Sequence, residues 1–336
     1  MAQASANDPR AASIAGEREA RGQSITRRIG AQNLGLVIAL VVIVVLIGSQ
    51  KGEIFFTSRN LLNIGAAVAL IGVVSIAQTM VMLSGGLDVS IASTVGLTSV
   101  AVAMSLRDMN NPVIALLVGL LVGSILGFIN GALITWGKLN PVIATLGTLS
   151  VYRGIGFVIT NGQAIGVTNN DFNAIASKVF EIPIPLLILI VMSAIFIVFL
   201  RYTDIGRNIY ALGGNSVAAR LAGINLNRYR LFLYTLSGLI AGVGAIILTA
   251  RAQSGQPASG SQGLEFQSIT AAVLGGTALS GGKGTIVGTL LGVLIIGTLN
   301  NGMILVGVQT FWQEVARGLL LVVATLIQIW QMREKA

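Results

Sequence analysis

Long apolar runs alternate with short polar segments along almost the whole chain after residue 34. A helix needs about 20 predominantly apolar residues to cross the hydrocarbon core of a bilayer, and several of these runs have that length. The pattern predicts an all-α fold, a polytopic bundle of transmembrane helices. We place ten spans, at residues 34–50, 61–83, 88–106, 112–136, 141–160, 183–200, 231–250, 268–281, 284–306 and 312–331.

Two places in this pattern indicate broken or re-entrant helices. The eighth span, 268–281, is short and rich in glycine, and the second and third spans meet at Ser84-Gly85-Gly86-Leu87-Asp88 without a proper loop. Irregular backbone is tolerated at membrane depth only where protein or a water-filled cavity satisfies its polar groups. We therefore expect one or two breaks inside the bundle.

Glycine recurs at every fourth position on two of the spans. These glycines are Gly119, Gly123, Gly127 and Gly131 on the fourth span and Gly284, Gly288 and Gly292 on the ninth. Glycine at this spacing lets helix backbones approach closely in lipid. We expect two packing ridges with no direct role toward a substrate.

The basic residues predict the orientation of the bundle, because cytoplasmic loops of membrane proteins carry an excess of Lys and Arg. With the N-terminus inside, fourteen of the 21 basic residues lie inside, and the five outside are Lys51, Arg59, Arg107, Lys178 and Arg251. This bias places both termini in the cytoplasm. Residues 1–33 form a disordered basic tail ahead of a membrane domain at 34–336, and 161–182 form a polar cap outside.

Two other interpretations of the charge are less favoured. The tail resembles the charged front of a signal peptide, but the first apolar run ends without a clear small-x-small cleavage site, which favours an uncleaved span. The net charge of +9 suggests nucleic acid in a soluble protein. Here the cations lie between apolar runs, so no nucleic-acid partner is expected and membrane lipid is the surrounding medium.

The composition excludes several kinds of chemistry. The chain has no cysteine and no histidine, and only 10% of its residues are charged, against about 25% in a soluble domain. Residues 277–285 resemble a phosphate-binding loop, but Thr277 stands where glycine is required and Gly284 where serine or threonine is required. We predict no enzyme activity, no metal site and no cofactor bound by this chain. Any ATP and Mg²⁺ belong to a partner subunit.

The acidic residues bear on the energy source. None of the twelve sits in the middle of a span, whereas proton-coupled carriers place ionisable groups at depth. A self-powered, proton-coupled carrier is therefore disfavoured. Sodium coupling through backbone carbonyls remains open.

Five polar residues are candidates for a translocation pathway. Asp88 opens the third span and is either a plain N-cap or a substrate contact. Asn140 stands before a proline at the start of the fifth span, and Thr145 and Thr148 follow three residues apart. Such neutral groups suit a neutral polyol in a pore, and they are equally common as hydrogen-bond formers between helices. Thr277, in the broken eighth span, completes the set.

The segment 201–230 is longer than a connection between spans needs to be. Asn215 or Ser216 can cap a short helix there, and Gly223 can end it. The pattern predicts a small amphipathic helix on the cytoplasmic face. A surface for docking a partner explains it better than a simple linker does.

A family resemblance begins in this same segment. It carries the motifs Gly206-Arg207, Ala211-Leu212-Gly213-Gly214-Asn215, Ala218-Ala219 and Gly223-Ile224. Further motifs are Gly85-Gly86-Leu87-Asp88-Val89-Ser90, Ile143-Ala144-Thr145-Leu146, Tyr152-Arg153-Gly154, Thr160-Asn161-Gly162, Gly275-Gly276-Thr277-Ala278-Leu279-Ser280-Gly281-Gly282-Lys283-Gly284 and Asn300-Asn301-Gly302. In this order the motifs closely resemble the ribose-type permeases of ABC sugar importers. One departure is Ala92, where that family usually has glycine.

The resemblance implies a function and a set of partners. It implies the inner-membrane permease subunit of a bacterial ATP-driven importer, which translocates a monosaccharide or related polyol. The partners it implies are a second copy of the permease, a double-cassette cytoplasmic ATPase and a periplasmic sugar-binding protein. Alternatives are an ABC permease for autoinducer-2, a nucleoside or a branched-chain amino acid, or a secondary carrier of a neutral solute.

The resemblance also implies where two of the partners dock. The coupling helix for the ATPase lies in 201–230, with Gly206, Arg207, Gly213, Gly214, Asn215, Ala218, Ala219 and Gly223. We expect the small side chains of Ala218 and Ala219, and Gly223, to enter a groove of the ATPase. On the other face, Arg59, Arg107, Lys178 and Arg251 are either contacts for acids of the binding protein or ordinary solvated charges.

Overall fold

The computed structural model of the chain describes residues 33–257 and 263–333, and the side chains up to residue 326. The predicted tail at 1–33 lies almost wholly outside the described residues.

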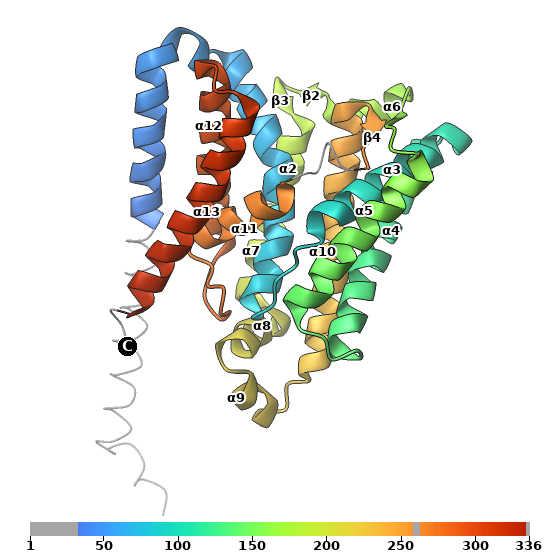
Figure 1. Cartoon of the computed structure of the whole chain (residues 1–336), viewed down its shortest axis with the longest axis vertical. Helices are drawn as coiled ribbons and strands as arrows, with labels where there is room; N and C mark the ends of the chain where they lie inside the picture. The colour runs from blue at the N-terminus through green and yellow to red at the C-terminus, as the bar shows by residue number, and fades with distance from the viewer. Residues whose placement is uncertain (1–32, 258–262, 334–336) are drawn as a thin grey trace, which may run out of the picture.

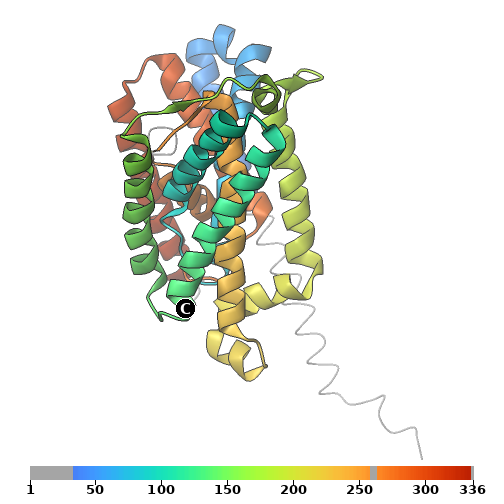
Figure 2. The same cartoon turned by 90° about the vertical axis from the view of Figure 1, so that its right-hand side faces the viewer.

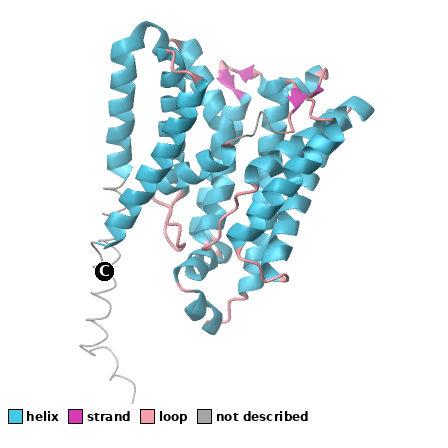
Figure 3. Cartoon of the chain, viewed as in Figure 1, coloured by secondary structure: helices cyan, strands magenta, loops and turns pink. Residues whose placement is uncertain are grey.

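The described chain is a helical bundle, with a helix at each of the ten predicted positions (Figure 3). They are α1 (Asn33–Phe55), α2 (Ser58–Leu83), α3 (Ile91–Met109), α4 (Pro112–Thr135), α5 (Pro141–Thr160), α7 (Ile184–Tyr202), α10 (Leu226–Ala252), α11 (Leu264–Leu274), α12 (Ile286–Val306) and α13 (Thr310–Arg333). Seven helices, α1, α2, α4, α5, α7, α10 and α12, are long and apolar enough to cross a membrane. The polytopic helical fold is confirmed, and the count of ten spans stays a prediction.

The two ends of the bundle differ in structure (Figures 1 and 2). At one end lie the short helices α8 (Asp204–Gly214) and α9 (Ser216–Leu221), and both the start of α1 and the end of α13 point toward this end. The other end carries α6 (Asn170–Asn173), the 3₁₀ turn η1 (Ala174–Ala176) and four two-residue strands. At this end, β1 (Ile165–Gly166) pairs antiparallel with β4 (Ser254–Gly255), and β2 (Lys178–Val179) pairs antiparallel with β3 (Ile182–Pro183). The polar segment 161–182 is thus a small folded cap.

Local sequence explains where several helices begin. Asn140 accepts a hydrogen bond from the Val142 amide at 2.9 Å, and Pro141 takes the first helical position, as predicted. Asn111 caps α4 in the same way ahead of a proline. The prediction for α3 is wrong in detail, because this helix begins at Ile91 and Asp88 lies before its start.

The two breaks occupy the predicted places with shifted boundaries. Residues 84–90 leave the helical path between α2 and α3. The eighth span is only the 11-residue helix α11, which starts earlier than predicted and gives way to irregular backbone at 275–285. Gly276, Gly281 and Gly282 adopt positive φ there, which explains why the helix cannot continue.

The glycine ridge on α4 packs against α10. A Cβ added to Gly123 would overlap the carbonyl oxygen of Gly238 and lie 3.0 Å from the Cα of Gly242. One added to Gly238 would overlap the carbonyl oxygen of Gly123 and lie 2.7 Å from the Cα of Gly127. The two backbones therefore touch, and the predicted packing role is confirmed. The matching glycines of α10, Gly238 and Gly242, have the same four-residue spacing, and sequence reasoning did not select them.

The second ridge holds only in part. Gly288 and Gly292 lie on α12 against the backbone of Gly275 and Ala271, so they let α11 pack closely. Gly284 precedes the helix, and its φ of 145° belongs to the break. Polar pairs also join α12 to α2, as Thr79 hydrogen-bonds Thr289 at 2.8 Å and Asn301 donates to Asn60 at 2.8 Å.

The contact between α4 and α10 makes a first prediction. Gly238→Ala inserts a methyl group into backbone, which cannot move like a side chain, and overpacking of this kind costs about 1–3 kcal/mol or more. We expect a lower thermal unfolding midpoint and less monodisperse protein in detergent, measured by fluorescence-detected size exclusion after heating. Gly318→Ala is the matched control, since a Cβ there meets nothing within 4 Å. Equal midpoints for both variants would refute the tight contact.

Candidate functional site

The break at 84–90 is held by hydroxyl groups from two neighbouring helices. The Thr145 hydroxyl on α5 accepts from the Val89 amide at 3.2 Å and donates to the Pro141 carbonyl at 2.8 Å. Tyr234 on α10 donates to the Leu87 carbonyl at 3.1 Å. Side chains thus replace helical partners for backbone groups inside the bundle.

Asp88 lies at the centre of a buried polar network beside this break. It is 2% exposed, and its carboxylate accepts from the Ser90 amide at 3.0 Å, from the Ser90 hydroxyl at 2.6 Å and from the Ser237 hydroxyl at 3.2 Å. Asn130 on α4 donates to the Ser90 hydroxyl at 2.7 Å, and Thr148 on α5 donates to Asn130 at 2.7 Å. The network ties α3, α4, α5 and α10 together.

The predicted pathway residues fall into separate groups. Thr145 and Thr148 are buried, and both make hydrogen bonds to neighbouring elements, as their alternative interpretation predicts. Thr148 reaches Asp88 through Asn130 and Ser90, whereas Thr277 is buried in the other break and Asn140 is an exposed helix cap. Their role in translocation stays a prediction.

Sequence reasoning missed Asn130, Ser237 and Tyr234 as members of this site. The signal for Asn130 is its polar amide inside the apolar run of the fourth span. Such residues in a membrane helix face protein and find a hydrogen-bonding partner. Nothing in the local pattern points to Ser237 or Tyr234, because their partners lie far away in the sequence.

The second break, 275–285, is fixed at the α8–α9 end of the bundle. The Gly282 amide donates to the Leu83 carbonyl at 2.9 Å, which joins this break to the end of α2. Tyr210 on α8 donates its hydroxyl to the Gly284 carbonyl at 2.9 Å. Burial raises the pKa of the Tyr210 phenol, so it remains a neutral donor.

Glycines bring both breaks against the end of α8. A Cβ added to Gly213 would overlap the Leu83 carbonyl oxygen and lie 2.5 Å from the Gly282 amide nitrogen. One added to Gly281 would lie 2.8 Å from the Cα of Gly85 and 2.9 Å from the Cα of Gly213. We call Gly85, Gly213, Gly281 and Gly282 the glycine junction. A pocket of about 360 Å³ opens beside it, lined also by Ser84, Leu212, Gly214, Asn215, Ser216, Arg230 and Ser280.

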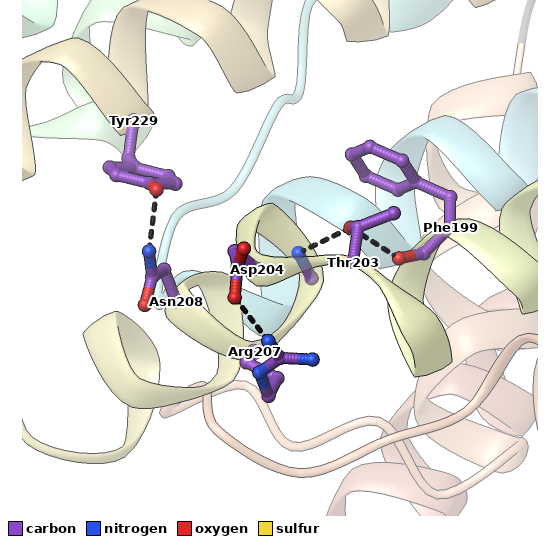
Figure 4. Close-up of polar contacts among 7 residues, drawn as sticks. Phe199, Thr203, Asp204, Arg207, Asn208 and Tyr229 are labelled. Atoms are coloured by element: carbon purple, nitrogen blue, oxygen red, sulfur yellow. Dashed lines mark hydrogen bonds and ion pairs between the residues drawn. The ribbon is translucent and has the colours of Figure 1, made fainter.

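The segment 201–230 forms two short helices, α8 and α9. Thr203 caps α8 by accepting from the Gly206 amide at 3.0 Å, and its hydroxyl donates to the Phe199 carbonyl at 2.6 Å (Figure 4). Asn208 donates to the Tyr229 hydroxyl at 2.6 Å, and Arg207 pairs with Asp204 (Figure 4). The α8 helix does not appear in the sequence prediction.

The predicted helix is α9, with the predicted signals at both ends. Asn215 accepts from the amides of Val217 and Ala218 at 3.1 and 3.0 Å, and Gly223 follows the helix with φ of 83°. The helix therefore has the predicted start and end signals, and it is six residues long.

Ala219 is buried, not exposed on α9, and its expected docking role stays a prediction. Ala219 is 4% exposed and packs with Leu212 and Leu226 at the corner between α8, α9 and α10. Gly206 is likewise buried. A Cβ added there would overlap the backbone of Leu200. A large residue at 219 therefore tests the packing of this corner, not docking.

The exposed face of α9 consists of other residues. Val217 is 69% exposed and Leu221 is 85% exposed, and Ala218 lies exposed between them. We call Val217, Ala218 and Leu221 the α9 apolar face. Sequence reasoning selected the small residues and passed over the two large apolar ones, since the phase of a six-residue helix is poorly fixed by its pattern.

The four cations predicted for the opposite end are all exposed, and three have partners. Arg107 pairs with Asp108 at 2.9 Å and Lys178 with Glu181 at 3.7 Å. Arg251 donates to the Ala66 carbonyl at 2.7 Å, which ties the end of α10 to α2. Arg59 has no ion pair among the described residues. Contact with a binding protein stays a prediction for all four.

Comparison with known proteins gives the family. Residues 60–325 match the family described as "Branched-chain amino acid transport system / permease component". The ribose import permease protein RbsC of Bacillus subtilis (strain 168) is 42% identical over 299 residues, which cover 88% of this chain and 92% of that protein.

Two other relatives come from Escherichia coli (strain K12). The D-allose transport system permease protein AlsC is 35% identical over 87% of this chain and 90% of its own length. The L-arabinose transport system permease protein AraH is 36% identical over 84% of this chain and 86% of its own length. No solved structure matches the chain. The chain therefore belongs to this permease family of ABC importers, as a multi-pass membrane subunit that transports and does not itself catalyse a reaction.

Proposed function

We propose that this chain is the permease of an ATP-driven importer for a monosaccharide or related polyol. The observation that carries the proposal is the glycine junction, where the exposed helix pair α8–α9 meets both broken helices of the bundle. An importer powered by another subunit needs such a link between a docking surface and its interior. Relatives named for ribose, D-allose and L-arabinose favour a neutral sugar as the cargo.

The mechanism follows from this link. A second copy of the permease completes the translocation unit, and a periplasmic binding protein delivers the sugar. A double-cassette ATPase binds the α9 apolar face and closes on ATP. Because Tyr210 and Gly213 lie on α8, movement of α8 shifts the Gly284 carbonyl and the Leu83–Gly282 contact together. The two breaks then reopen toward the other side of the membrane.

The orientation rests on the charge pattern and the position of the helix pair. The basic segment 201–230 lies at one end of the bundle, and the start of α1 and the end of α13 point toward that end (Figure 1). Basic segments remain in the cytoplasm. We place α8 and α9 on the cytoplasmic face of the bacterial inner membrane, with both termini, and the strands β1–β4 on the periplasmic face.

Uptake measurements test the proposed cargo and energy source. The full-length permease, reconstituted in vesicles with its ATPase and loaded binding protein, should take up radiolabelled ribose, allose or arabinose only with ATP. Uptake of leucine in place of all three sugars would assign it to amino-acid import. Sugar uptake by the permease alone, without the ATPase, would make it a secondary carrier.

The α9 apolar face predicts how ATPase binding responds to mutation. Burying a leucine in an interface contributes about 1.5–3 kcal/mol, so Leu221→Glu should weaken ATPase binding about tenfold or more. Leu221→Met is the matched control, because it keeps an apolar side chain at the same place. The measurement is co-purification with the ATPase at several ATPase concentrations. Equal recovery of ATPase with both variants would rule out docking on this face.

The glycine junction predicts that alanine substitutions at the neighbouring residues Gly213 and Gly214 differ sharply in their effect on stability. Gly213→Ala should separate α8 from the breaks and lower stability by about 1–3 kcal/mol, because its Cβ overlaps backbone. Gly214→Ala should leave stability almost unchanged, since a Cβ there meets nothing within 4 Å. Thermal unfolding in detergent compares them. A Gly213 variant as stable as the Gly214 variant would contradict the close contact.

A further inference from the structure

An ion pair between Arg153 and Glu265 connects α5 to α11 inside the bundle. Glu265 lies in the first turn of α11 with its side chain 6% exposed, and Arg153 on α5 is 29% exposed. The distance from Arg153 Nη2 to Glu265 Oε1 is 3.8 Å, which is too long for a hydrogen bond. Ionisable residues inside membrane helices are rare and by default indicate a functional site.

One oxygen of the Glu265 carboxylate lacks a hydrogen bond among the described residues. Its Oε2 atom is buried and has no hydrogen bond among the described residues, although the amides of Gly263 and Glu265 lie close to the carboxylate. The Asp88 carboxylate, in contrast, accepts hydrogen bonds on both oxygens. A buried acceptor left without a donor is costly, and this cost falls when a ligand supplies the donor.

The surroundings of the pair carry further polar groups and both signs of charge. Arg317 on α13 lies beside Gly263, and it pairs with Glu314 at 3.2 Å. Its Nε atom is buried without a hydrogen bond among the described residues, as is Oδ1 of Asn300 on α12. Two guanidinium groups, two carboxylates and an amide therefore surround the start of α11, with no net charge.

Arg153 is the more exposed member of the pair, so a ligand reaches the pair from the α5 side. The helix α5 packs on α3 and α4, whereas α11 packs on α2, α12 and α13. The two helices stand in different parts of the bundle (Figure 1), and the ion pair reaches between those parts.

We propose that Arg153 and Glu265 form a contact site for the hydroxyl groups of the sugar as it enters the permease. A sugar hydroxyl donates to Glu265 Oε2, and the guanidinium of Arg153 donates to a neighbouring sugar oxygen. The pair has no net charge, so a neutral polyol fits it, whereas an anion meets the carboxylate and a cation meets the guanidinium. The inference rests on the proposed function and adds the residues that hold its cargo.

The experiment measures coupling between a protein group and a sugar hydroxyl. The full-length permease is reconstituted with its ATPase and binding protein, and maximal uptake rates are measured for ribose and for its single deoxy analogues at saturating binding protein. Glu265→Gln keeps the shape of the side chain and removes its charge. Arg153→Lys keeps the charge and loses the planar fork. Glu53→Gln, an exposed carboxylate near the outer end of α1, is the control.

If Glu265 contacts a sugar hydroxyl, the effect of the mutation and the effect of removing that hydroxyl should not add. Glu265→Gln should lower the maximal rate for ribose about tenfold and lower it little for the one analogue that lacks the contacted hydroxyl. Arg153→Lys should show the same behaviour for an adjacent oxygen. The control variant should match wild type with every sugar, and all variants should bind the loaded binding protein equally.

Three results would overturn the proposal, each in a recognisable way. Equal losses for every analogue would assign the ion pair to a structural role alone. Failure of both variants to assemble would assign it to folding. Uptake of leucine and of no sugar by the wild-type importer would remove the proposed function itself, and the sugar site with it.

Discussion

A backbone that leaves its helix inside a membrane bundle must have its amides and carbonyls satisfied by the protein, and the rest of this structure depends on that constraint. Within residues 33–257 and 263–333, the segments 84–90 and 275–285 are two such places. The hydroxyls of Thr145, Tyr234 and Tyr210 form hydrogen bonds with backbone groups of these segments. The Gly282 amide donates a hydrogen bond to the Leu83 carbonyl at the end of α2. Each partner comes from a different element, so satisfying the breaks also fixes how α2, α5, α8 and α10 assemble.

The same contacts explain how a surface helix can act on the interior. The α8 helix touches both breaks, through a hydroxyl at Tyr210 and through backbone at Gly213. Backbone contact without intervening side chains leaves no rotamer that can absorb a displacement. In the proposed mechanism, a push on α9 reaches both breaks at once, because Asn215 joins α9 directly to the end of α8.

Sequence reasoning succeeded where the cause is local. Apolar runs located the helices, Asn140 and Asn215 marked two helix starts, and the glycines marked both breaks. It failed where the cause is a partner distant in the chain. The position of Asp88 ahead of α3 depends on Ser237, which approaches only when α10 packs against α4. The burial of Ala219 likewise depends on the turn that α9 makes against Leu226.

Among the described residues, the buried carboxylates of Asp88 and Glu265 differ in how many hydrogen bonds they accept. Asp88 lies beside a break and accepts hydrogen bonds on both oxygens, from Ser90 and Ser237, and its role in translocation stays a prediction. Glu265 lies in the first turn of α11 with one oxygen lacking a hydrogen bond among the described residues, and its partner Arg153 stands beyond hydrogen-bonding distance. In a low-dielectric interior, a saturated network rigidifies the fold, while an unsaturated one retains affinity for a group that arrives from outside.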